Sequence, residues 1–308
     1  MKLEVELAPR HKSGLLLRNP VMLAAGPAGY GVEDSKSAEI HRLGAIVSAS
    51  VTLRPYAGPA QPWLLESPAG LLSAYNRPSP GASRVIRSYA ATWETRQTPL
   101  IVNLAATSLA EFAELAACFE GVAGVAALEL NLAAPNLAAE GAPFGADAAL
   151  VARLITAVRR ACTLPIIAKL LPCTSDLRPV ALAAASAGVD ALTLVHALPG
   201  LSIDLATRRP ALFGGLSGPA IKPLALRLFY ETARELRIAY PRLPLIGGGG
   251  ITSASDALEF ILAGASAIQL GTLHLTNPHL GVEILEGIAS FMQTAGVTIL
   301  TELIGAAL

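Results

Sequence analysis

The sequence predicts an α/β protein built as a (β/α)8 barrel, or TIM barrel, with long loops at the carboxyl-terminal face of its strands. Three observations predict this fold class: eight short apolar runs alternate with helical segments, the runs are apolar almost throughout, and 308 residues suit one such barrel. Strands without polar alternation are covered on both faces, as in a parallel sheet beneath helices. We therefore expect residues 1–308 to form one barrel domain.

Each apolar run ends in residues typical of turns. The runs are VMLAAG (21–26), AIVSAS (45–50), LIVNLA (100–105), ALELNL (127–132), PIIAKLL (165–171), ALTLVHA (191–197), LPLIGGGG (243–250) and SAIQLGT (266–272). Apolar residues at helical spacing predict helices at residues 109–121, 146–162, 226–240 and 253–265. A doubly wound open sheet is the alternative fold. Its signature is a Gly-rich turn after the first strand and an acidic residue at the end of the next strand, and this sequence lacks that signature.

Two long segments interrupt the regular alternation. Residues 54–98 are rich in Pro, Gly and Ser, and residues 198–221 form a second excursion. Connections of this length are uncommon in compact domains and are often functional. Both segments leave the carboxyl ends of predicted strands, where barrel enzymes place their active sites, so we expect them to form a lid or the walls of a pocket.

Composition and charge exclude several classes of partner. Hydrophobic residues make up 53% of the chain and charged residues 15%, so much apolar surface must be hidden in a core or an interface, which favours a homodimer. The 23 basic and 23 acidic residues balance, and no Lys/Arg run is present, so no nucleic-acid partner is expected. Three irregularly spaced cysteines indicate neither a disulfide framework nor a metal site.

We expect neither a secretory leader nor a membrane anchor from this sequence. The first residues, MKLEVELAPRHK, are charged where a signal peptide needs an apolar run. Residues 262–282 lack full charges, but Gly and Asn-Pro turn signals interrupt them. We therefore expect a cytoplasmic protein that does not contact a membrane.

Polar side chains stand at the carboxyl ends of four adjacent predicted strands. They are Asn103, Asn131, Lys169 and His196. Lys169 is the most informative, because an ammonium in the apolar run IIAKLL needs an anionic or strongly polar partner. It is a candidate cofactor contact or Schiff-base amine, and the structural alternative is pairing with a buried carboxylate such as Glu129.

Glycine-rich loops follow the last two predicted strands. GGGG (247–250) and LGT (270–272) let backbone N–H groups approach a phosphate, and the loops after strands 7 and 8 commonly bind phosphate in these barrels. A glycine run alone is also compatible with a simple turn. The second loop beside it favours a phosphate site, and GGLSGPA (214–220) is a candidate third wall.

Motifs along nearly the whole chain resemble the dihydroorotate dehydrogenase family. They are NPVMLAAG (19–26), SPAGLLSA (67–74), VNLA (102–105), ELNLAAPN (129–136), IIAKLLP (166–172), IDLATRRP (203–210), GGLSGPAIKP (214–223), IGGGGI (246–251) and GASAIQLGT (264–272). The order of IDLATRRP and GGLSGPAIKP is most similar to the class 1B catalytic subunit of pyrimidine biosynthesis. That class pairs with an iron–sulfur flavoprotein subunit that passes electrons to NAD; this chain has no Cys cluster for an iron–sulfur centre, so the partner would supply it.

The resemblance implies an oxidoreductase that binds FMN at the barrel mouth. Its phosphate would lie on the backbone of Gly248, Gly249, Gly271 and Thr272, with Gly218 near the ribityl chain. The positions implied to contact the isoalloxazine ring, or the space above it, are Ala24, Gly26, Asn103, Asn131 and Lys169.

The catalytic base of the family is missing from this sequence. The resemblance implies a Cys in the cytosolic class, or a Ser in the membrane-associated class, at the position of Ala134 in LNLAAPN. The other departures also fall mainly on the substrate side: Ala49 replaces a lysine, Ser73 an asparagine, and His196 with Ala197 an Asn-Thr pair. Of the residues implied to bind orotate, Asn136 clearly remains. We therefore expect lost or altered dihydroorotate oxidation.

Several functional alternatives stay open. His196 is the best candidate for a replacement base, because histidine titrates near neutral pH, but it is equally suited to a hydrogen-bonding wall. Cys173 after strand 5 is a more distant candidate. Besides an FMN oxidoreductase with another substrate, the chain fits a non-catalytic FMN-binding pseudoenzyme or interaction protein, or a phosphate-binding lyase that uses Lys169 as a Schiff base.

Overall fold

The computed structural model describes residues 1–31, 39–75, 78–135, 137–139 and 141–308. Eight parallel strands form a closed barrel in which each strand pairs with its successor along the chain and the last pairs with the first. The strands are β3 (Val21–Leu23), β4 (Ala45–Val47), β7 (Leu100–Leu104), β8 (Val125–Asn131), β9 (Ile166–Lys169), β10 (Ala191–Leu194), β13 (Leu245–Gly248) and β14 (Ala267–Leu270). All eight predicted strands are confirmed, and the closed ring excludes the open sheet.

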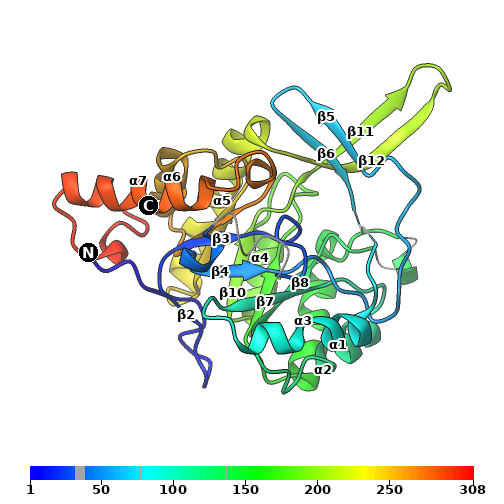
Figure 1. Cartoon of the computed structure of the whole chain (residues 1–308), viewed down its shortest axis with the longest axis horizontal. Helices are drawn as coiled ribbons and strands as arrows, with labels where there is room; N and C mark the ends of the chain where they lie inside the picture. The colour runs from blue at the N-terminus through cyan, green and yellow to red at the C-terminus, as the bar shows by residue number, and fades with distance from the viewer. Residues whose placement is uncertain (32–38, 76–77, 136, 140) are drawn as a thin grey trace.

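Helices surround the barrel (Figure 1). They are α1 (Ala82–Glu94), α2 (Leu109–Ala117), α3 (Ala148–Ala161), α4 (Arg178–Ser186), α5 (Lys222–Ala239), α6 (Ala254–Leu262) and α7 (Leu280–Thr294). The four predicted helices correspond to α2, α3, α5 and α6. Ser253 caps α6, because its hydroxyl oxygen accepts from the Asp256 N–H at 3.2 Å. Within the described ranges, no helix combines the length and the apolar character needed to cross a membrane.

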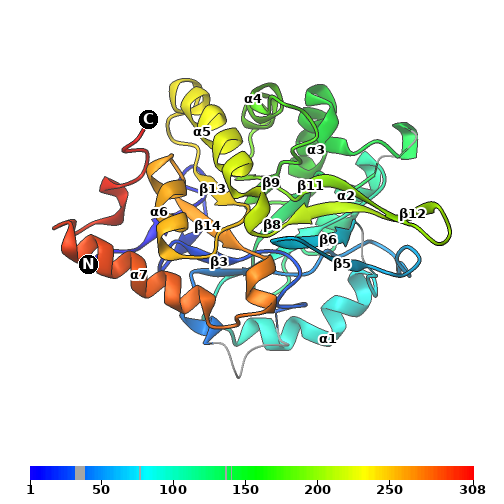
Figure 2. The same ribbon diagram turned by 90° about the horizontal axis from the view of Figure 1, so that it is seen from above.

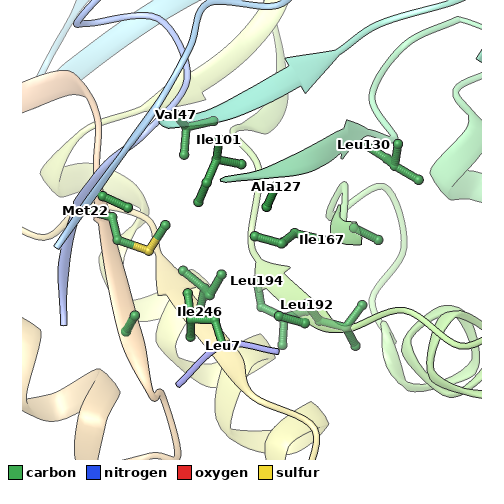
Figure 3. Packing of buried hydrophobic residues seen from close by; sticks show 14 of the residues in the cluster. Leu7, Met22, Val47, Ile101, Ala127, Leu130, Ile167, Leu192, Leu194 and Ile246 are labelled. Carbon is green, nitrogen blue, oxygen red and sulfur yellow. The ribbon is translucent and has the colours of Figure 1, made fainter. Parts of the chain in front are cut away.

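The barrel interior is packed with apolar side chains. Figure 3 shows Met22, Val47, Ile101 and Ile246 from four strands within one cluster, and all four are fully buried. Leu7 belongs to the same cluster. It follows β1 (Val5–Glu6), which pairs with β2 (Leu16–Leu17). His11, between these two strands, hydrogen-bonds the Thr163 carbonyl just before β9 at 2.8 Å, so this segment lies at the amino-terminal end of the barrel.

The two long segments pair with each other in a four-stranded antiparallel sheet. Its order is β11-β12-β6-β5, with bounds β5 (Leu64–Ser67), β6 (Gly70–Ala74), β11 (Leu198–Asp204) and β12 (Arg209–Ser217). The sheet projects beyond the barrel at one side (Figure 1, Figure 2). A Cβ at Gly214 would lie 2.2 Å from the Ser73 carbonyl oxygen, so the close pairing of β12 with β6 requires glycine there.

Residues 54–98 are therefore more than a loop. After the β5–β6 hairpin they continue into α1, the ordinary helix between β4 and β7. The Pro- and Gly-rich start of the segment concealed this helix in the sequence. The sequence analysis did not predict α4 or α7 either. Short 3-10 helices lie in the connections between the longer elements: η1 (Ile40–Arg42), η2 (Leu137–Ala139), η3 (Phe144–Ala146), η4 (Pro219–Ile221), η5 (Thr272–Leu275) and η6 (Leu300–Glu302).

Candidate functional site

A cavity of about 520 Å³ opens at the carboxyl ends of the barrel strands. This volume lies within the range of about 300–1,000 Å³ typical of small-molecule sites. The predicted site residues that line it are Ala24, Gly26, Asn103, Asn131, Lys169, His196, Gly218, Gly248, Gly249, Gly271 and Thr272. The structure thus brings all of these candidates to one mouth, and Asn136 lies outside the described residues.

Four glycines in the cavity lining form what we call the glycine cradle: Gly218, Gly248, Gly249 and Gly271. A Cβ added at Gly248 would lie 3.5 Å from its nearest neighbour, and one at Gly271 would lie 3.8 Å from its nearest neighbour, so both would make only ordinary contacts. Gly249 has a φ of +123° and Gly218 a φ of +95°, conformations that favour glycine. Thr272 Oγ1 donates to Ser217 Oγ at 2.7 Å and fixes the edge of this cradle.

Beneath the cavity, the buried carboxylate of Glu129 joins four barrel strands. It accepts hydrogen bonds from Asn103 Nδ2 in β7 at 2.8 Å, Thr193 Oγ1 in β10 at 3.1 Å and Gln269 Nε2 in β14 at 2.7 Å. Glu129 itself is in β8 and is fully buried. These donors replace the water that a buried carboxylate loses.

Lys169 is linked to this carboxylate through Gln269. Its Nζ donates to Gln269 Oε1 at 2.8 Å, while the amide nitrogen of the same side chain donates to Glu129. The sequence left open a direct pairing of Lys169 with Glu129. In the structure Gln269 lies between the two side chains, so the pairing is indirect. An ammonium has three donors and Gln269 uses one of them, so Lys169 retains donors for a ligand at the cavity that it lines.

The two asparagines are held in fixed orientations. Ser50 Oγ donates to Asn103 Oδ1 at 2.6 Å, and Asn131 Nδ2 donates to the same hydroxyl at 3.5 Å. The Ala133 N–H donates to Asn131 Oδ1 at 3.0 Å. The hydrogen-bonding groups at the cavity floor are thus arranged before any ligand binds.

Among the described residues of the turn after β8, 132–135, no side chain can act as a proton acceptor. Ala133 and Ala134 are 7% and 1% exposed. The Ala134 N–H donates to the Asn131 carbonyl at 3.2 Å, and its own carbonyl accepts from Phe144 N–H at 3.2 Å. The described part of this turn is therefore hydrogen-bonded around two methyl side chains.

His196 and Tyr75 form an aromatic wall of the cavity. Their ring centroids lie 5.9 Å apart at a tilt of 42°. Within the described chain, neither His196 Nδ1 nor Tyr75 Oη has a hydrogen-bond partner. Burial, together with the nearby charge of Lys169, lowers the pKa of His196 to about 3. The imidazole is therefore neutral at physiological pH and is a weak proton acceptor.

Sequence reasoning missed the role of Gln269 and Thr193 and did not single out Tyr75 as a wall residue. A polar residue within each apolar run, AIQL and ALTL, was the available signal for the first two. Neither run reveals which strand its polar side chain faces, because that depends on closure of the ring.

The fold and the site define a (β/α)8-barrel protein with a cavity at the carboxyl ends of its strands. The chain belongs to the dihydroorotate dehydrogenase family, whose sequence model, described as "Dihydroorotate dehydrogenase", matches residues 10–292. It is 42% identical over 298 residues to the "Dihydroorotate dehydrogenase B (NAD(+)), catalytic subunit" of Desulforudis audaxviator (strain MP104C), covering 96% of this chain and 95% of that protein. A protein of the same description from Pelobacter propionicus (strain DSM 2379 / NBRC 103807 / OttBd1) is 42% identical over 297 residues, with 96% of each chain covered.

Replacing Gln269 tests the buried network. The Gln269→Leu change removes the partner of the Lys169 ammonium and one donor to Glu129, so we expect the free energy of unfolding at pH 7 to fall by about 3–5 kcal/mol. Thr193→Val removes one neutral donor to the same carboxylate, and we expect a loss of about 1 kcal/mol. Denaturant unfolding measures both, and equal losses would contradict the link through Gln269.

The low pKa of His196 predicts a pH dependence of stability. The folded-state pKa of about 3 lies below the ordinary value of 6.5, so the folded state binds fewer protons than the unfolded state between these values. This contribution to stability is fully present above about pH 6.5 and is lost as the pH falls toward 3. In thermal unfolding from pH 7.5 to 4, His196→Asn should therefore lose less stability on acidification than the parent chain, and parallel curves would contradict the burial of a neutral imidazole.

Proposed function

We propose that the chain is an FMN-dependent oxidoreductase on the dihydroorotate dehydrogenase scaffold, with lost or altered oxidation of dihydroorotate. One contrast carries this proposal. The glycine cradle and Lys169 line the cavity, but the buried methyl group of Ala134 occupies the position at which the resemblance implies the catalytic base.

The described residues support the proposal of an FMN site. Backbone at Gly248, Gly249, Gly271 and Thr272 suits a phosphate, because N–H groups can approach it without side-chain interference. Gly218 lies on the same side, while the ring would lie against Ala24, Gly26, Asn103, Asn131 and Lys169. When bound, the flavin would supply two-electron chemistry. The Lys169 ammonium would then stabilise negative charge that develops on the ring.

The substrate side supports altered chemistry. With a pKa of about 3, His196 is proposed as a neutral hydrogen-bonding wall rather than as the replacement base. Asn136 remains a proposed substrate contact, although it lies outside the described residues. An FMN-binding pseudoenzyme is the second candidate, and the same alanine turn at Ala133 and Ala134 favours it.

We also propose partners and a location. The relatives are named as catalytic subunits of an NAD(+)-dependent enzyme, which supports an iron–sulfur flavoprotein subunit as the electron-transfer partner. Exposed Leu201, Ile203 and Phe213 on the β11–β12 hairpin offer apolar surface to a second copy in a homodimer. Three free cysteines suit the reducing cytoplasm.

Filling the cradle should abolish cofactor binding without unfolding the chain. Gly248 is in β13, and its added Cβ would meet only ordinary contacts, so Gly248→Val should fold while its methyl groups occupy cavity space. We expect FMN affinity, measured by fluorescence titration, to fall about 100-fold or more, which corresponds to about 2.7 kcal/mol. The unfolding midpoint of the cofactor-free variant should remain close to that of the cofactor-free parent. Unchanged FMN affinity would contradict the proposed phosphate site.

Turnover of dihydroorotate tests the missing base. We expect the FMN-loaded parent to bleach with dihydroorotate under anaerobic conditions about 10² to 10⁴-fold more slowly than an enzyme with a positioned base. Ala134→Cys should accelerate bleaching at least about 10-fold, because it restores a thiol at this turn. Ala134→Ser gives the matched hydroxyl variant. Rapid bleaching of the parent would show that another group performs this role and would refute the proposed loss.

A further inference from the structure

We infer that the ion pair between Lys222 and Asp256 positions the backbone that binds the phosphate of the proposed cofactor. The pair joins two segments that contribute to the cavity wall, the turn at 218–222 and the loop at 248–252. The inference rests on the proposed function, because it needs a flavin phosphate at the glycine cradle. It assigns a role to two side chains that lie outside the cavity lining.

The two segments approach each other as bare backbone. Gly250 has a φ of +73°, and an added Cβ there would lie 2.8 Å from the Gly218 carbonyl oxygen and 2.8 Å from the Lys222 backbone nitrogen. Because no side chain fits between these backbones, their spacing is set by the groups that tie them together. Gly218 on one segment and Gly249 on the other belong to the glycine cradle, so a change in this spacing would alter the cradle.

One carboxylate is bonded to both segments. Asp256 lies in the first turn of α6, and its Oδ2 accepts from the Thr252 N–H at 2.9 Å and from the Thr252 hydroxyl at 2.7 Å. Its Oδ1 accepts from the Nζ of Lys222, the first residue of α5, at 2.6 Å. Asp256 is thus fixed to the loop after β13, and Lys222 links it to the turn that carries Gly218.

Hydrogen bonding keeps this partly buried pair ionised. The side chains of Lys222 and Asp256 are 22% and 13% exposed, so solvent screens their charges only in part. Burial alone would raise the pKa of Asp256, but the hydrogen bonds from Lys222 and Thr252 outweigh it and lower this pKa to about 2. Burial also opposes the charge of Lys222, but its hydrogen bonds to Asp256 and Glu259 raise its pKa. Both groups of the pair are therefore charged at neutral pH.

Lys222 also balances negative charge near the proposed phosphate. Its Nζ donates to Glu259 Oε2 at 2.8 Å as well as to Asp256, so one ammonium lies between two carboxylates of α6. Without Lys222, these two carboxylates would lie beside the loop at 248–252 and lack this counter-ion. Loss of the ammonium would therefore weaken phosphate binding in two ways, because the cradle is loosened and because like charges repel.

A second ion pair offers a matched control. Arg159 donates to Asp190, and their side chains are 29% and 10% exposed. Asp190 also accepts from the N–H of Ile166, the first residue of β9, at 2.8 Å, so this pair lies at the amino-terminal end of the barrel. Breaking either pair should lower the free energy of unfolding, but only the pair at Lys222 should act on the cofactor.

FMN and riboflavin, which differ by the phosphate, test the inference. We would free the full chain and its variants of bound flavin, titrate each with either flavin and follow the flavin fluorescence. We expect Lys222→Met to weaken FMN binding about 10-fold or more and riboflavin binding less than about 3-fold. Arg159→Met should change FMN affinity by no more than about 2-fold, because distant sites act independently.

The comparison of the two flavins also defines the contrary result. Equal weakening of FMN and riboflavin in Lys222→Met, or no weakening of FMN, would overturn the inference. If riboflavin does not bind the parent, the two variants decide on FMN alone. A loss in Lys222→Met that Arg159→Met does not share supports the inference, and equal losses overturn it.

Two milder variants separate positioning from folding. Lys222→Arg keeps the cation and should retain FMN affinity within about 3-fold of the parent. Thr252→Val removes one donor to Asp256 without a change of charge and keeps the Thr252 N–H donor, so we expect FMN affinity to fall about 3-fold with riboflavin affinity unchanged. If Lys222→Met does not fold, Thr252→Val decides, and unchanged FMN affinity in that variant overturns the inference.

The outcome separates this inference from the proposed function. A parent chain that cannot bind FMN defeats the proposed function itself. A parent chain that binds FMN, with variants that bind it equally well, defeats only the role of the ion pair.

Discussion

The buried carboxylate of Glu129 connects the barrel interior to the cavity above it. Its charge must be compensated without water, and the compensation comes from donors on β7, β10 and β14. Gln269 is engaged at both ends of its amide, so it also holds the ammonium of Lys169 on β9. The positions of Asn103 and Lys169 at the cavity therefore follow from the requirement to solvate one hidden charge.

The two sides of the cavity respond differently to substitution. The cradle around Gly248 and Gly271 would bind a phosphate through backbone N–H groups, which persist as long as no larger side chain enters. The substrate side depends on individual side chains, and one substitution can remove a base or a cation. This difference supports the proposal that the chain retains a flavin site although alanine stands at positions 49 and 134, where the resemblance implies reactive groups.

Much of the fold was predictable because buried parallel strands are apolar without interruption, and all eight runs were recognised in this way. Helix α4 escaped because its sequence, RPVALAAAS, is short and alanine-rich, with little contrast between its faces. The pairing of β6 with β12 joins residues about 140 positions apart and leaves no local signal. For the site, the ends of the predicted strands identified Asn103, Asn131 and Lys169. The hydrogen-bond partners of Asn103 and Lys169 could not be assigned from the sequence, because they lie on other strands and depend on how the barrel closes.

The antiparallel sheet built from the two excursions has a mechanical consequence. β6 hydrogen-bonds β12, Tyr75 directly follows β6, and His196 and Ala197 directly precede β11. A displacement of either hairpin would therefore be transmitted to the other through the backbone hydrogen bonds between β6 and β12. The two hairpins beside the cavity are therefore parts of one sheet rather than two independent flaps.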